Sequence, residues 1–152
     1  WKPIPGSPEA IARLSKAGYR IVVATNQSGV ARGLFDLATL AAMHSKMHTC
    51  VNQAGGRIDA IFFCPHAADS QCDCRKPKPG LFRDILARFH ADPAEVTAVG
   101  DSLRDLQAAV AAGCRPVLVL TGKGQRTMQA GGLPPDTVVR TDLAAVAAEL
   151  VP

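Results

Sequence analysis

Short apolar runs alternate along this chain with longer segments in which apolar residues recur every three or four positions. Continuous runs are typical of buried strands, and the three-to-four spacing is typical of helices. We expect strands at 21–24, 60–63, 96–99, 116–120 and 137–139. We expect helices at 8–17, 37–53, 80–89, 102–112 and 143–150. This alternation predicts a three-layer α/β fold, with one parallel sheet and helices on both of its faces.

Residues typical of helix ends support these boundaries. Ser7 stands directly before Pro8, as an N-cap stands before a proline in the first turn. Asp36 and Asp142 are expected to cap the helices that follow them, because an Asp side chain accepts a hydrogen bond from the first turn. The segment 124–134 is expected to be irregular or weakly helical.

Polar residues follow four of the expected strands, beginning at Thr25, Cys64, Asp101 and Thr121. In an open parallel sheet the ligand binds at the carboxyl ends of the strands. We therefore expect the loops at these four positions to converge on one site.

The loop after the second strand carries four possible metal ligands within eleven residues, namely Cys64, His66, Cys72 and Cys74. Structural zinc sites use four nitrogen or sulfur ligands, which leave no open position for catalysis. No secretory signal is visible, so we expect zinc rather than disulfide bonds, and a cytoplasmic protein. The alternative is a set of scattered thiols beside a solvated histidine.

A basic pair, Arg75 and Lys76, follows these cysteines at once. Lys76 offers a point charge to a phosphate group, and Arg75 can bind two phosphate oxygens together. Pro77 and Pro79 restrict the backbone around the pair, which favours fixed side chains. The alternative is a solvated basic pair at the end of a loop.

Asp101 directly follows the third strand, at the edge of the sheet where a ligand would bind. Mg2+ prefers oxygen ligands and phosphate-bearing substrates, so we expect Asp101 to be a magnesium ligand. Asp105 lies one helical turn further on and could orient the site. The alternative is that Asp101 or Ser102 only caps the helix that begins there.

The loop after the first strand offers hydroxyl and amide groups at Thr25, Asn26, Gln27 and Ser28. Together with loop backbone amides, such groups can hold phosphate oxygens, and we expect this loop to bind substrate. An ordinary turn with helix-capping side chains is the alternative.

Composition narrows the class of ligand. Apolar residues make up 47% of the chain and charged residues 20%, as in globular domains, and no apolar run approaches the ~20 residues that cross a membrane. The net charge of +4 is mild, the basic residues are not clustered, and aromatic residues are few, which argues against nucleic-acid binding. A small acidic ligand fits, and nothing demands more than a monomer. We assign no role to His44, His48 and His90.

Taken together, these motifs resemble those of the haloacid dehalogenase (HAD) superfamily of phosphatases. Thr25 falls at the second motif of that superfamily, Lys76 at the third, and Gly100-Asp101 at the fourth. The segments ATNQSGVARG, CPH…CDCRKPKPG and GDSLRDLQAA are similar to those of the D-glycero-D-manno-heptose 1,7-bisphosphate 7-phosphatases. Histidinol-phosphate phosphatases of the same branch share the zinc loop. The resemblance extends through nearly the whole chain and implies a Rossmann-like fold.

The resemblance implies a two-step phosphoryl transfer that depends on Mg2+. An aspartate attacks phosphorus, a second aspartate protonates the leaving alcohol, and water cleaves the aspartyl-phosphate. Thr25, Lys76 and Asp101 would be catalytic, with Asp101 on Mg2+. The loop 25–28 and Arg75 would contact phosphate or sugar, while the zinc site would shape the substrate loop without performing chemistry.

The first motif of the superfamily, D-x-D, is absent from residues 1–152. The superfamily places it on an opening strand that is central in the sheet, some tens of residues before Thr25. We therefore expect residues 1–152 to be one HAD-like phosphatase domain that is truncated at its N-terminus, lacks the central strand, and is inactive as given. Ser102 stands where some heptose phosphatases have Lys, which leaves the anomer preference open.

Three functions follow as hypotheses. The first is removal of the 7-phosphate from D-glycero-D-manno-heptose 1,7-bisphosphate, a step in lipopolysaccharide sugar synthesis. The second is a histidinol-phosphate phosphatase. The third, from another class, is a non-catalytic, zinc-stabilised module that binds phosphosugars, which the missing D-x-D would favour.

Overall fold

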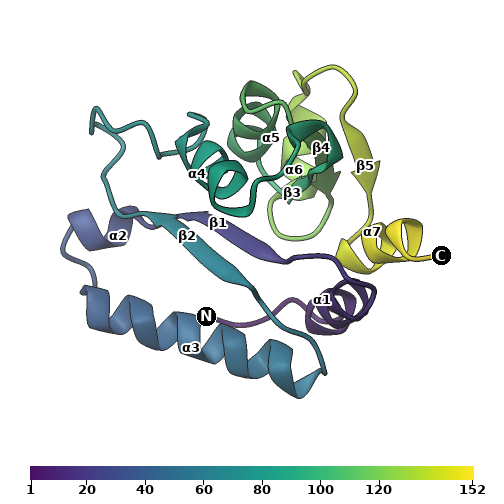
Figure 1. The fold of residues 1–152 in the computed structure, drawn as a ribbon. Helices are drawn as coiled ribbons and strands as arrows, with labels where there is room; N and C mark the ends of the chain where they lie inside the picture. The colour runs from purple at the N-terminus through teal and green to yellow at the C-terminus, as the bar shows by residue number, and fades with distance from the viewer. The chain divides into compact units, whose positions relative to one another are not determined.

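The computed structural model describes residues 1–152, which form two compact units (Figure 1). Unit 1 comprises Trp1–Ser70 together with Leu143–Pro152, and unit 2 comprises Gln71–Asp142. Each unit has its own parallel β-sheet and its own helices.

The sheet of unit 1 is a parallel pair of strands, β1 (Val22–Asn26) and β2 (Ala60–Cys64). Asn26 lies opposite Cys64 in the register of this pair. The carboxyl ends of the two strands are therefore neighbours, and they carry two of the polar motifs that the sequence places at strand ends.

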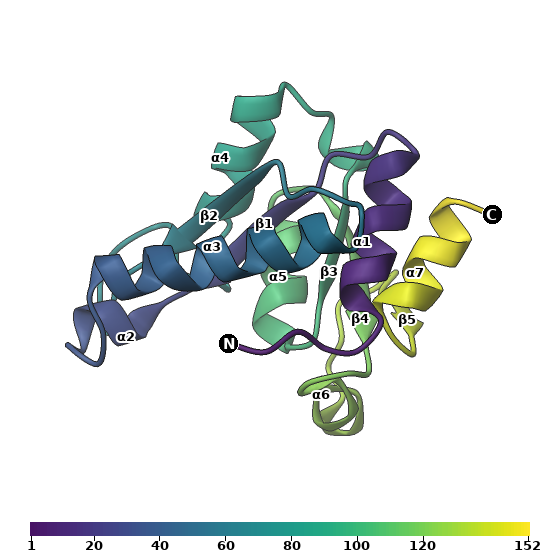
Figure 2. The same ribbon diagram turned by 90° about the horizontal axis from the view of Figure 1, so that it is seen from below.

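Four helices complete unit 1, and they are α1 (Ser7–Lys16), α2 (Ser28–Ala31), α3 (Leu37–Gln53) and α7 (Leu143–Leu150). The long helix α3 runs beside the strands, as Figure 2 shows. The ring of His44 on α3 meets the ring of Phe63 on β2 edge to face, with 5.7 Å between the ring centroids.

The last helix of the chain packs against the first. Ala10 and Leu14 of α1 and Ala147 of α7 form one buried cluster. The guanidinium of Arg13 donates a hydrogen bond to the carbonyl of Val151, just beyond α7. Unit 1 is thus built from both ends of the chain.

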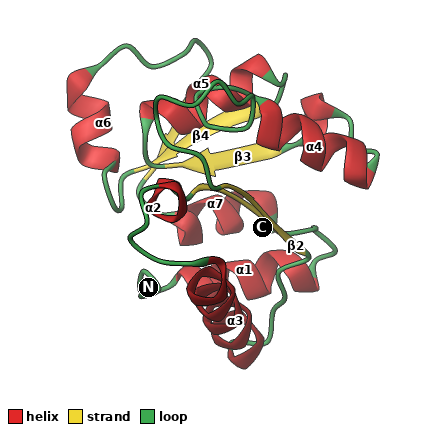
Figure 3. Cartoon of the chain, turned by 90° about the vertical axis from the view of Figure 1, so that its left-hand side faces the viewer, coloured by secondary structure: helices red, strands yellow, loops and turns green.

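The sheet of unit 2 has three parallel strands in the order β3-β4-β5. Figure 3 shows β3 and β4 side by side. The strands are β3 (Thr97–Gly100), β4 (Arg115–Val119) and β5 (Val138–Arg140). The helices are α4 (Gly80–Phe89), the 3-10 helix η1 (Pro93–Glu95), α5 (Leu103–Ala111) and α6 (Gly124–Ala130). No helix of either unit is long and apolar enough to span a membrane.

The core of unit 2 lies between its strands and the helices α4 and α5. Ala98 of β3, Ala109 of α5 and Cys114 are buried together, and Phe82 and Leu86 of α4 pack against them. Small residues on β3 and α5 allow the helix and the strand to approach closely. This packing fixes the carboxyl end of β3, where the sequence places Asp101.

The parallel strands and flanking helices confirm the α/β fold expected from the sequence. One difference is that the five strands form two sheets and not one, because β1 and β3 are not paired and each stands at the edge of its sheet.

Of the helix caps expected from the sequence, one is confirmed and one is wrong. Asp36 caps α3 by accepting a hydrogen bond from Thr39 N at 2.8 Å, as expected. The expected cap at Ser7 is wrong by one residue, because Gly6 adopts the left-handed conformation (φ 87°) and Ser7 is already helical. The segment 124–134 contains the regular helix α6, and the four-residue helix α2 is too short to give a periodic signal.

Candidate active site

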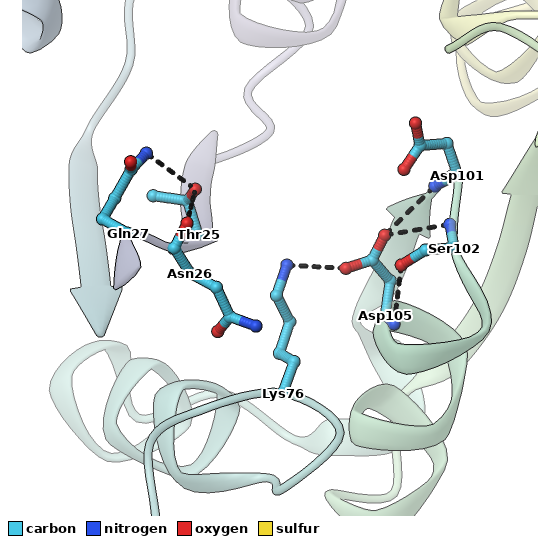
Figure 4. Close-up of polar contacts among 7 residues, drawn as sticks. All are labelled: Thr25, Asn26, Gln27, Lys76, Asp101, Ser102 and Asp105. Atoms are coloured by element: carbon cyan, nitrogen blue, oxygen red, sulfur yellow. Dashed lines mark hydrogen bonds and ion pairs between the residues drawn. The ribbon is translucent and has the colours of Figure 1, made fainter. Parts of the chain in front are cut away.

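Lys76 and Asp105 form an ion pair at the carboxyl end of β3. Lys76 Nζ lies 2.6 Å from Asp105 Oδ1, and the two side chains are only 12% and 16% exposed (Figure 4). Burial alone would raise the pKa of the Asp105 carboxyl, but the Lys76 ammonium and the hydrogen bonds from Ser102 lower that pKa below its ordinary value of 3.8. The Asp105 carboxyl is therefore ionised at neutral pH.

The other carboxylate oxygen of Asp105 organises the start of α5. Asp105 Oδ2 accepts hydrogen bonds from the backbone N–H groups of Asp101 and Ser102, each at 3.2 Å. Ser102 Oγ accepts one in return from Asp105 N at 3.4 Å, which completes a capping box. Ser102 is thus the helix cap, and the side chain of Asp101 takes no part in this capping box.

Gly100 is required by this arrangement. A Cβ atom at residue 100 would lie 2.4 Å from the Cβ of Asp105 and 2.5 Å from its Oδ2. Asp105 consequently occupies the space that any other residue at 100 would fill. The Gly-Asp pair at the strand end reflects close packing of α5 as well as chemistry.

Asp101 lies where a magnesium ligand was expected, at the carboxyl end of β3. One of its carboxylate oxygens, Oδ2, accepts a hydrogen bond from Lys123 N at 2.9 Å, while Oδ1 accepts none in the structure. A magnesium ion is commonly bound through one or two carboxylates together with water and substrate phosphate. The chemistry of Oδ1 fits that use.

The loop that carries Arg75 and Lys76 is closed by its own hydrogen bonds. Gly80 N donates to Asp73 O at 2.9 Å, and Lys78 N donates to Arg75 O at 2.9 Å. A Cβ at residue 80 would lie 2.2 Å from Asp73 O, so only glycine fits there. The Lys76–Pro77 peptide bond is cis. Lys76 is therefore held by its backbone as well as by Asp105.

Arg75 has a buried guanidinium nitrogen, Nη1, without a hydrogen-bond partner. A buried donor that is left unpaired costs about 1–3 kcal/mol, more when it is charged. Arg75 is therefore suited to an anionic ligand that would accept its hydrogen bond.

Cys64, His66, Cys72 and Cys74 gather around one point in their loop. The ligand atoms of the four residues all lie within 4.8 Å of one another, and Cys64 Sγ lies 3.3 Å from His66 Nδ1. A tetrahedral zinc ion with bonds of about 2.3 Å to sulfur and about 2.0 Å to nitrogen keeps its ligands roughly 3.5–3.8 Å apart. None of the five cysteines forms a disulfide bond, and the four clustered residues fit a structural zinc site.

The loop Thr25–Ser28 is held against the first residues of the Cys/His loop. Gln27 N donates to the carbonyl of Cys64 at 2.7 Å, and Ala31 N donates to the carbonyl of Pro65 at 3.2 Å. The side-chain amide of Gln27 donates to Thr25 Oγ1 at 3.2 Å (Figure 4). A backbone atom of a candidate zinc ligand thus fixes the candidate phosphate loop.

Phe35 closes the turn that follows this loop, and no sequence pattern indicated this contact. A Cβ at Gly29 would lie 2.3 Å from Phe35 Cε1, so the aromatic ring rests directly on the glycine. Leu34 N also donates to the carbonyl of Gly29 at 2.9 Å. An aromatic residue six positions from a glycine has no recognisable spacing, which is why sequence reasoning missed it.

The structure brings Lys76, Asp101, Ser102 and Asp105 together within unit 2. Residues 25–28 belong to unit 1, and their convergence with the unit 2 residues stays a prediction. Sequence reasoning considered Asp105 without assigning it a partner. It missed Lys123 and Thr127, which contact Asp101 from a segment expected to be irregular.

Comparisons with known proteins agree with these motifs. A profile of the HAD-hydrolase-like family matches residues 73–146. The chain is 60% identical over 151 residues to the D-glycero-beta-D-manno-heptose-1,7-bisphosphate 7-phosphatase of Bordetella bronchiseptica, which covers 99% of this chain and 84% of that protein. It is 54% identical to the protein of the same name from Pseudomonas putida, over 99% of this chain and 86% of that one.

Solved structures give the same result. The crystal structure of D,D-heptose 1,7-bisphosphate phosphatase from B. bronchiseptica, complexed with magnesium and phosphate, matches with a TM-score of 0.97 over 99% of this chain and 84% of that chain, at 60% identity. The enzyme of that name from Burkholderia thailandensis matches with a TM-score of 0.82 at 56% identity, over 99% of this chain and 87% of that one.

Proposed function

Because this chain belongs to the HAD-like hydrolase family of the heptose-1,7-bisphosphate 7-phosphatases, we propose that it hydrolyses the 7-phosphate of D-glycero-D-manno-heptose 1,7-bisphosphate. The observation that carries the proposal is the buried Lys76–Asp105 pair beside Asp101, in a chain 60% identical to a phosphatase of this name. The related proteins are named for the beta anomer, and we extend that preference to this chain.

Each site residue has a role that its surroundings support. Lys76 is a cation whose position is fixed by Asp105, so it can neutralise phosphate charge without reorganising. Arg75 offers the donor that lacks a partner. Residues 25–28 offer hydroxyl, amide and backbone groups to the phosphate or the sugar. Asp101 would hold Mg2+ through its carboxylate, and the ion would offset phosphate charge in the transition state.

The nucleophile and the general acid are not assigned to residues of this chain. The family mechanism uses the two aspartates of a D-x-D motif, which residues 1–152 do not contain. The chain's own contribution is to bind, orient and neutralise the phosphate group. Residues 1–152 expressed alone should accordingly bind a phosphosugar without releasing phosphate.

We also propose that a zinc ion has a structural role. Cys64, His66, Cys72 and Cys74 would hold it with four protein ligands, which leaves no position for substrate. Its effect on the reaction would pass through the loops that it fixes. We further propose that residues 1–152 form one HAD-like phosphatase domain that works as a monomer in the cytoplasm.

The test is a substrate panel with the full-length protein from the complete reading frame. We expect Mg2+-dependent phosphate release from the beta anomer of heptose 1,7-bisphosphate, slower release from the alpha anomer, and little from histidinol phosphate. Release from histidinol phosphate at the higher rate would replace the proposed substrate. Absence of phosphate release from all three would remove the proposed activity.

A further inference from the structure

Asp101 is held at three of its atoms by hydrogen bonds from two different parts of unit 2. Its N–H donates to Asp105 Oδ2 at 3.2 Å. Its carbonyl accepts from the Thr127 hydroxyl at 2.7 Å, and its Oδ2 accepts from Lys123 N at 2.9 Å. The backbone on both sides of Cα and one carboxylate oxygen are thus fixed together.

The segment that follows β4 supplies two of these contacts. The register of the sheet places Gly100 opposite Leu118, so the chain after β4 passes beside Asp101. Gly122 adopts a left-handed backbone conformation (φ +58°), and a Cβ there would lie 2.3 Å from Asp101 Oδ2. Glycine therefore serves both the turn and the close approach of the carboxylate.

The N–H of Lys123 points at Asp101 because the residue precedes a helix. Lys123 is the N-cap position of α6, and an N–H at this position is not needed by the helix ladder. Thr127, one turn into α6, shares its hydroxyl between Asp101 O and Lys123 O, at 2.7 Å and 3.1 Å. The hydroxyl ties the helix and the strand end together.

We propose that Gly122, Lys123 and Thr127 are positioning residues that set the affinity of Asp101 for the divalent cation. The hydrogen bond from Lys123 N occupies Oδ2 and leaves Oδ1 for the ion, while the Thr127 bond fixes the backbone from which the carboxylate extends. Contacts to a metal ligand orient it before the metal arrives, so their loss weakens binding of the metal. This inference rests on the proposed role of Asp101.

The first test removes the hydroxyl of Thr127 in the full-length protein. We expect Thr127→Val to raise the dissociation constant for Mn2+, a probe for Mg2+, roughly three- to tenfold, as loss of one hydrogen bond would. Thr127→Ser keeps the hydroxyl and should bind within about twofold of wild type. The matched control is Thr137→Val. It removes a hydroxyl that donates to Pro134 O at 2.7 Å and is not bonded to Asp101. It should leave Mn2+ affinity unchanged.

The second test moves the carboxylate directly. Gly122→Ala places a methyl group against Asp101 Oδ2, and we expect roughly tenfold weaker Mn2+ binding. Gly131→Ala is the matched control, since Gly131 also has a positive φ (+72°) but nothing lies within 4 Å of its Cβ position. Both substitutions place a Cβ on a backbone with positive φ, and only Gly122→Ala puts it against the carboxylate of Asp101.

Mn2+ binding is followed by electron paramagnetic resonance of the free ion, and unfolding of each variant by circular dichroism. If Thr127→Val and Gly122→Ala fold and bind Mn2+ like wild type while Asp101→Asn loses the ion, the inference is overturned. The proposed role of Asp101 then still stands. Wild type and Asp101→Asn with equal Mn2+ affinity would overturn both the inference and the proposed role of Asp101. If Gly122→Ala does not fold, Thr127→Val decides the question.

Discussion

The two candidate halves of the site are held in place by different forces. In unit 2, Lys76 and Asp101 are fixed by an ion pair, a capping box and backbone hydrogen bonds that need no ligand. In unit 1, the loop Thr25–Ser28 is fixed by backbone hydrogen bonds to Cys64 and Pro65, at the start of the Cys/His loop. The first half is therefore preorganised by its own charges, whereas the second depends on a loop that a metal would order.

The largest expected effect comes from zinc removal by a chelator. Structural zinc contributes folding free energy directly, so we expect the amide hydrogens of Gln27 and Ala31 to exchange about 100-fold faster or more. The amides of Asp101 and Ser102, which donate to Asp105, should keep most of their protection. Hydrogen exchange measured residue by residue by NMR checks this, and equal losses at all four amides would contradict the difference between the halves.

The next effect comes from Asp105→Ala, which removes the carboxylate that pairs with the buried Lys76 ammonium. We expect the free energy of unfolding to fall by about 3 kcal/mol. Asp59→Ala is the matched control, because Asp59 also pairs with a cation, but the side chain of Arg57 is 56% exposed. That control should cost about 1 kcal/mol or less. Urea unfolding measures the free-energy loss of each variant. Equal losses would show that the buried Lys76–Asp105 pair stabilises the fold no more than the exposed Arg57–Asp59 pair.

A smaller change tests the loop of unit 1. Gly29→Ala would press a methyl group into the ring of Phe35, and overpacking of this kind costs about 1–3 kcal/mol. The double variant Gly29→Ala, Phe35→Leu should recover part of that loss, because Leu frees space beside residue 29. Thermal unfolding and inorganic phosphate binding are the measurements. A loss of unfolding free energy in the double variant that exceeds the summed losses of the two single variants would refute the contact.

Acid should weaken the two units at different pH values. Burial, and secondarily the charge of His48, lower the pKa of His44 on α3 below its ordinary 6.5. His44 is thus neutral in the folded protein while the unfolded chain takes up a proton, so stability falls as the pH drops below 6.5 toward the lowered pKa. The same drop leaves Asp105 charged, since its pKa is below 3.8, and its stabilising contribution is lost only as the pH falls through that lower value.

The comparison of variants across pH separates these two contributions. The difference in unfolding free energy between wild type and His44→Phe should change between pH 7 and pH 5. Wild type should lose stability relative to the variant as the pH falls. The difference between wild type and Asp105→Asn should stay constant over that range and shrink only below pH 3.8. A shift of the Asp105 difference near neutral pH would contradict the lowered pKa.

Sequence patterns predicted the features that are local. Asp36 caps α3 through an atom three residues away, as predicted, and Ser102 caps α5 at the same separation, which the sequence offered only as an alternative. The apolar runs likewise located all five strands to within one or two residues. The four candidate metal ligands could be recognised because they fall in one short loop.

Contacts between distant residues could not be predicted in this way. Lys76 and Asp105 are 29 positions apart, and Asp101 and Thr127 are 26 apart, so their meeting depends on how α4, α5 and β4 pack. Sequence placed Asp105 near the site but gave no means of pairing it with Lys76. The contact between α6 and Asp101 could not be predicted, because residues 124–134 show no clear apolar periodicity.

The most direct test of the proposed site is phosphate release from heptose 1,7-bisphosphate by full-length protein, with the position of the released group followed by 31P NMR, for wild type and Lys76→Ala. The account predicts Mg2+-dependent loss of the 7-phosphate by wild type, and a rate at least about 100-fold lower in a folded Lys76→Ala variant, since a fixed cation that stabilises transition-state charge is gone. Equal rates in the two proteins, or loss of the 1-phosphate instead, would contradict it.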